Sequence, residues 1–93
     1  MKMNWRSDII ESTYRELKRP ALCFITEQSS LGNLQLTVDK PVENGMIVLE
    51  KDEMITVVGT CMKKVNSSTM KIKIVITTAG EMGWLWPNET RKV

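Results

Sequence analysis

The sequence contains no histidine and only two cysteines, Cys23 and Cys61. Histidine is the commonest metal ligand and the usual base beside a nucleophilic cysteine. Two thiols alone lack the further ligands that a zinc site needs. We therefore expect no metal, no cofactor and no catalytic cysteine, and we interpret both thiols as small side chains of the core.

Long apolar runs are also absent. None approaches the roughly 18 residues of a membrane-spanning helix. Residues 1–8 contain no apolar run of the kind that a secretory signal requires. We therefore expect a cytoplasmic protein that does not enter a membrane and whose thiols stay reduced.

The charge imbalance is small as well, with 13 Lys and Arg against 11 Asp and Glu, a net charge of +2. Chains that bind nucleic acid usually have a pI above about 9 or a clear basic stripe. The net charge by itself therefore does not favour that class. A chain of 93 residues that is 42% apolar and 26% charged is typical of one folded domain with a modest core.

The N-terminal segment carries a helical pattern. Its apolar residues recur at spacings of three and four, which predicts an amphipathic helix over residues 5–18 with the stripe Trp5, Ile9, Ile10, Thr13, Tyr14 and Leu17. Pro20 ends the pattern. Because an isolated helix of this length is marginal in water, we expect segment 1–20 to pack on the rest of the protein.

From residue 21 onward the pattern changes to strands. Two-residue alternation between turn signals predicts about six of them, over 21–26, 34–38, 46–49, 54–62, 70–76 and 82–86. Short connections of this kind favour a small antiparallel barrel. The expected fold is mainly β (α+β), a single domain in which an N-terminal α-helix precedes a six-stranded barrel over 21–93.

The order of features over residues 46–93 resembles an SH3-like barrel. A long strand, a polar hairpin loop, a second strand and a tight turn lead to Gly83, Trp84 and Leu85. SH3-like families place a glycine, an aromatic and an apolar residue there, before a short helical turn that would be 86–89 here. The resemblance also implies a first strand at 21–24 and an enlarged first loop over 27–45.

The chain departs from the SH3 domains that bind proline-rich peptides. Those domains line their groove with aromatic residues. Here the corresponding positions carry Cys23, Met70 and Glu89. The resemblance therefore implies the barrel without recognition of proline-rich peptides.

Two of the three tryptophans lie in the last predicted strand. Alternation places Trp84 and Trp86 on one face and Leu85 on the other, in the core. We expect Trp86 to be the more exposed indole because Pro87 ends the strand beside it. An exposed indole pair is typical of a protein-binding anchor; the alternative is that the N-terminal helix covers both rings.

Basic residues form the second candidate site. A single patch of Lys63, Lys64, Lys71, Lys73, Arg91 and Lys92 would contact phosphates, with a tryptophan available for base stacking. Lys71 and Lys73 must share a face because they are two apart in a strand. The alternative is that these residues form the solvated face of a sheet, with lysines that protect its edges.

No element of a catalytic site is visible, and we expect a non-enzymatic module that binds a protein partner. The small chain, rich in Lys, Asn and Met, gives the impression of a virus- or phage-encoded accessory protein that modulates a host factor. One alternative is a nucleic-acid-binding barrel that uses the Lys/Trp surface. A further alternative is a homo-oligomer that sequesters a small nucleotide at a subunit interface.

Overall fold

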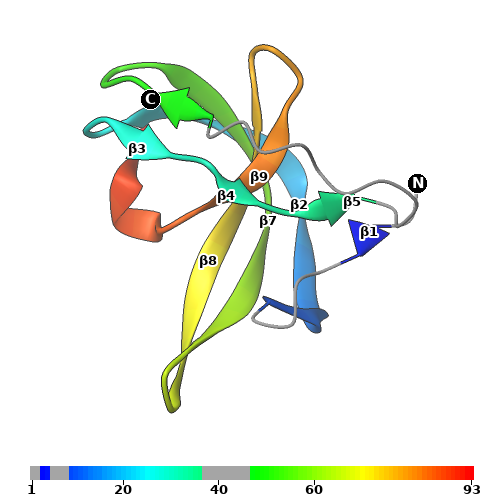
Figure 1. Cartoon of the computed structure of the whole chain (residues 1–93). Helices are drawn as coiled ribbons and strands as arrows, with labels where there is room; N and C mark the ends of the chain where they lie inside the picture. Colours follow the sequence, from blue (N-terminus) through cyan, green and yellow to red (C-terminus); the bar gives the residue numbers. More distant parts are fainter. Residues whose placement is uncertain (1–2, 5–8, 37–46) are drawn as a thin grey trace.

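The computed structural model describes residues 3–4, 9–36 and 47–93, and the side chains of 9–34 and 47–93. The chain forms a strongly curled antiparallel sheet, a half-barrel (Figure 1). No helix in the described part of the chain is long and apolar enough to cross a membrane.

One six-stranded sheet organises the fold, in the order β10-β2-β7-β8-β9-β4. Its elements are β2 (Ile9–Ile25), β4 (Gly32–Asn33), β7 (Met54–Val65), β8 (Ser68–Thr77), β9 (Met82–Leu85) and β10 (Thr90–Lys92), with the 3-10 turn η1 (Pro87–Glu89) before β10. Two small ladders join β1 (Met3–Asn4) to β5 (Gln35–Leu36) and β3 (Ser29–Ser30) to β6 (Val48–Leu49).

The prediction of an N-terminal α-helix is wrong. The described part of segment 5–18 belongs to β2, a strand of 17 residues that runs through Pro20 and pairs with β7. Trp5 lies outside the described residues. The only helical turn in the described chain is η1, so the α+β description is replaced by a mainly β fold.

The helical spacing has a physical cause within β2. The strand is irregular twice, between Ile10 and Arg15 and again between Glu16 and Ala21. Each irregularity adds residues on β2 that have no partner on β7, so inward-facing positions return about every four residues and imitate a helical period. Pro20 lies within the second irregularity, where its missing N–H leaves no gap in the ladder.

Side chains satisfy the backbone at the first irregularity. The Met62 amide donates to Thr13 Oγ1 at 3.0 Å. The Thr13 hydroxyl and the Cys61 thiol both donate to the Ile10 carbonyl, at 2.7 and 2.8 Å. These bonds replace the ladder bonds that the extra residues interrupt, so the long strand can bend without leaving buried polar groups unpaired.

Most of the later strands were predicted correctly. The expected strands 54–62, 70–76 and 82–86 correspond to β7, β8 and β9, and the helical turn expected at 86–89 corresponds to η1. The predicted strands 34–38 and 46–49 are represented by β5 and β6; residues 37–46 lie outside the described residues. Gly59 follows a β-bulge in which Val58 is the extra residue between the Val57–Val75 and Gly59–Ile74 pairs.

Two apolar clusters form the core. The first contains Cys23, Ile25, Leu49, Ile55, Val57, Val75 and Leu85. The second contains Ile9, Leu34, Cys61, Ile72 and Ile74. Both thiols are free and buried, which confirms their assignment to the core, and the fully buried Leu85 confirms the predicted face of its strand.

Replacing Leu85 with alanine should lower the free energy of unfolding by about 2–5 kcal/mol, because the side chain is 0% exposed in the first cluster. Leu22→Ala is the matched control, since Leu22 is 50% exposed on β2 and should change stability by less than about 0.5 kcal/mol. Urea unfolding of the two variants checks both values. Equal losses for the two leucines would contradict the assignment of strand faces.

Candidate binding surface

An open groove of about 560 Å³ lies where β9 ends beside β8. Its lining is mainly apolar and comprises Val65, Met70, Lys71, Trp86, Pro87 and Asn88. We call it the Trp86 groove. Met70 is 49% exposed at its wall.

The groove exists because the short strand β9 pairs with only part of β8. Pro87 has no N–H for a ladder, so β9 ends at Leu85 and the chain turns through η1. The Trp86 amide donates instead to Glu89 Oε1 at 2.8 Å, which fixes the turn. β8 continues past this point as one arm of the hairpin that it forms with β7, the arm that projects downward in Figure 1.

The two indoles share a face of the sheet, as alternation predicted. Trp84 lies opposite Ile74 in the register, and both indoles pack against the second cluster. Their rings meet edge to face, with centroids 5.1 Å apart and an interplanar angle of 86°. Both are half-buried, and only Trp86 lines the groove.

The surface over Trp84 is formed by β4 and a lysine. The indole lies against Gly32, its register partner, where the absence of a side chain leaves room for the ring. Lys63 Nζ lies 5.3 Å from the ring centroid, within the range of a cation–π interaction. The segment expected to cover the indoles as a helix is a strand paired with β7, and its Ile9 belongs to the cluster against which both rings pack.

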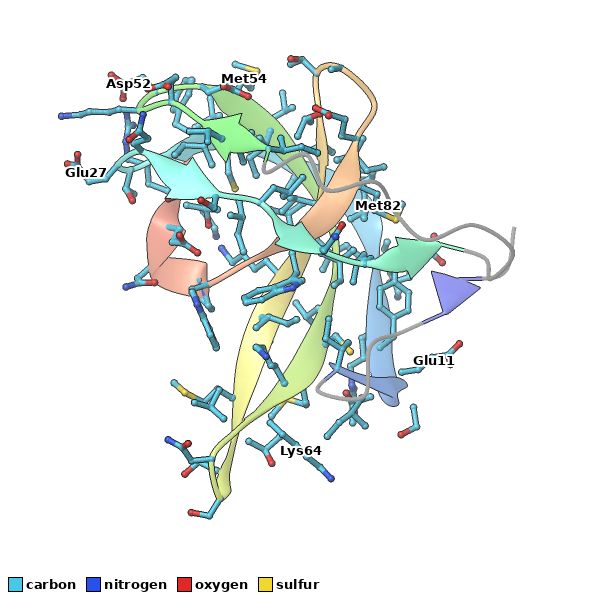
Figure 2. The ribbon with its side chains drawn as sticks, viewed as in Figure 1. Glu11, Glu27, Asp52, Met54, Lys64 and Met82 are labelled. Carbon is cyan, nitrogen blue, oxygen red and sulfur yellow. The ribbon has the colours of Figure 1, made fainter. Side chains whose placement is uncertain are left out.

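The six basic residues do not form one patch. Arg91 Nη2 lies 2.7 Å from Asp52 Oδ1, and its guanidinium stacks 4.8 Å from the ring of Phe24. Asp52 and Lys64 lie at opposite ends of the molecule in Figure 2, so Arg91 is remote from Lys64 near the tip of the β7–β8 hairpin. The neighbouring Lys92 is exposed on β10.

The four lysines of the hairpin take different roles. Lys63 covers Trp84, and Lys64 is exposed near the hairpin tip. Lys71 is exposed at the groove, whereas the half-buried Lys73 donates to Thr90 Oγ1 at 3.0 Å. Lys71 and Lys73 share a face, as predicted, and it is the face opposite Trp84, because Lys73 pairs with Leu85 and Ile74 with Trp84.

The whole hairpin region is free of acidic residues. From Thr60 to Gly80 the sequence contains four lysines and no Asp or Glu. This absence of acidic residues could have been recognised in the sequence. The groove residues Val65, Met70, Pro87 and Asn88 were not proposed as a site, because only the early end of β9 brings them together.

A second cavity, of about 430 Å³, lies beside the first irregularity of β2. Its lining includes Thr13, Tyr14, Arg15, Cys61 and Lys71. Burial raises the pKa of Tyr14 above its ordinary value, and the charges of Glu16 and Cys61 raise it further. Among the described residues, no three His, Cys, Asp or Glu side chains gather closely enough to hold a metal ion.

Comparisons of the chain with protein-family models, with curated proteins and with solved structures find no significant match.

Tyr14 is the only tyrosine, so the ultraviolet absorbance of tyrosinate reports its titration alone. We expect its pKa to lie above 10.0 in the folded protein and near that value after denaturation. Because the folded state holds the proton more tightly, the Tyr14 contribution to stability is complete below pH 10.0 and declines as the pH rises above it. Tyr14→Phe should remove this decline; a folded pKa at or below 10.0 would show that the ring is not desolvated.

Gly32→Ala should destabilise the protein by about 1–3 kcal/mol, because the new Cβ would collide with the Trp84 indole and push it away from β4. The neighbouring variant Asn33→Ala alters an exposed residue of the same short strand and should have an effect below about 0.5 kcal/mol. Denaturant unfolding followed by tryptophan fluorescence measures both. If Gly32→Ala leaves the free energy of unfolding unchanged, Trp84 does not pack on this glycine.

Proposed function

We propose that this chain is a non-enzymatic module that binds a protein partner through the Trp86 groove. The observation that carries the proposal is the exposed apolar wall that Val65, Met70 and Trp86 present beside an open end of the sheet. Aromatic and methionine side chains are enriched at protein interfaces, and a half-buried indole in a groove is a frequent energetic anchor.

The lining of the groove favours a protein over a nucleic acid. Single strands of nucleic acid need aromatic faces on which bases stack along a basic track. In the groove only Trp86 offers such a ring, while Val65, Met70 and Pro87 are aliphatic. Lys73 and Arg91 are already engaged with Thr90 and Asp52. An apolar side chain of a protein segment fits this lining better than a base.

The finer description, an SH3-like barrel, is part of the same proposal. It is supported by the order β10-β2-β7-β8-β9, in which the last strand returns to pair with the first long one. It is also supported by the 3-10 turn that precedes β10. Such barrels commonly carry binding sites between their loops, which agrees with a binding module and implies no particular partner.

Selection from a displayed library of random peptides tests the function without a known partner. The whole chain, immobilised, should enrich related sequences. Trp86→Ala should weaken binding of the enriched peptides by about 2 kcal/mol or more, and Met70→Ala should also weaken it. Leu22→Ala, which removes a side chain of similar exposure on β2, should bind them like the wild type.

Thermal melts of the three variants separate a loss of binding from a loss of fold. Failure to enrich any peptide, or enrichment that is unchanged in Trp86→Ala and Met70→Ala, would contradict the proposal. Tight, salt-sensitive binding of single-stranded oligonucleotides that depends on Trp86 would instead support the nucleic-acid alternative, for which the acid-free hairpin is the favouring observation.

A further inference from the structure

We propose that the outer edge of β8, from Ser68 to Ile72, accepts an extended acidic segment of a partner protein as an additional β-strand, with its apolar side chains in the Trp86 groove. This inference rests on the proposed function and specifies its partner: a strand in which apolar and acidic residues alternate.

The edge of β8 is open over this stretch. β8 pairs with β7 from Ser68 to Thr77, but with β9 only from Lys73 to Ile76. Within the described part of the chain, no strand pairs with the other edge of Ser68–Ile72. Such an edge presents unpaired backbone N–H and C=O groups to any extended chain. At about 3.3 Å per residue it has room for roughly five residues of a partner strand.

The groove and the edge form one surface. Met70 and Lys71 belong to the edge and also line the groove, whose far wall is Trp86 and Pro87. A strand added along Ser68–Ile72 would lie beside the same edge of β8 with which β9 pairs, beyond the end of β9 at Leu85. Main-chain bonds to β8 would then hold the segment while its side chains enter the groove.

The two faces of the hairpin differ in chemistry. Residues directly opposite in the register share a face, so Val65, Met70 and Ile72 lie on the face of the indoles. Lys64, Lys71 and Lys73 lie on the other face. An added strand alternates its side chains between these faces. The fitting partner therefore places apolar residues toward Trp86 and Asp or Glu toward Lys71.

Charge complementarity also decides against a second copy of this chain as the occupant. Pairing of two identical β8 edges would bring the lysines of one acid-free hairpin against those of the other. Like charges placed opposite each other across strands are destabilising, and lysines on an edge are a common protection against self-association. The same lysines attract an acidic segment.

The test uses the whole chain, labelled for NMR, and synthetic peptides of about seven residues, long enough to span the edge. The main probe alternates isoleucine with glutamate. One control replaces each glutamate with lysine, and a second keeps the composition but groups the residues into two blocks. We expect the alternating acidic peptide to bind at least about tenfold more tightly than either control. Its affinity should fall with added salt.

Backbone methylation tests the strand directly. In an antiparallel or parallel pair, alternate amides of the added strand point toward β8. N-methylation of one alternate set should weaken binding at least about tenfold, while N-methylation of the other set should have little effect. The amides within residues 68–72 that point away from β7 should also gain protection from hydrogen exchange when the unmethylated peptide is bound.

These outcomes separate a failure of the added strand from a failure of the Trp86 groove. If groove-dependent peptides bind equally well with either set of amides methylated, the added strand is wrong and the groove stands. If glutamate and lysine peptides bind equally, the acidic specificity is wrong. If residues 68–72 gain protection with protein concentration alone, a second copy is the occupant and the inference is overturned.

Discussion

The pairing of β2 with β7 is the constraint on which the rest of the structure depends. β2 is the longest strand, and it reaches from the second cluster at Ile9 to the first cluster at Cys23 and Ile25. Its two irregularities and the bulge at Val58 curl the sheet, and β2 contributes buried residues to both clusters. The buried thiol of Cys61, which bonds to Ile10, shows how closely the bend depends on particular side chains.

The candidate surface follows from a second local feature, the end of β9 at Leu85, just before Pro87. Because β8 extends beyond this point to form the hairpin with β7, the curled sheet has one long arm that β9 does not cover. The indoles are held at its base by their edge-to-face contact, by Gly32 and by Lys63. Rigid support of this kind lowers the entropy cost of binding, since the anchor side chain is already in place.

The sequence predicted local features well wherever neighbouring residues decide them. The strands β7, β8 and β9 and the opposite faces of Trp84 and Leu85 follow from alternation and turn chemistry. The turn before β10 was implied by the resemblance to an SH3-like barrel. β2 was mistaken for a helix because its irregular pairing depends on contacts with β7, although its β-branched Ile9, Ile10 and Thr13 favour a strand. The basic patch was predicted from residue type alone, and the structure places Arg91 beside Asp52 and Phe24, at the other end of the molecule from Lys64. The groove was missed because its walls come from three elements that meet only in the folded chain.

NMR chemical shifts and cross-strand contacts of residues 9–25 show whether β2 is a strand paired along β7. We expect extended-chain Cα shifts for the paired segments and a nuclear Overhauser contact between Glu16 and Gly59, which are partners in the register. Continuous helical shifts over residues 9–18, with no contact to β7, would contradict the fold and with it the position of the binding surface.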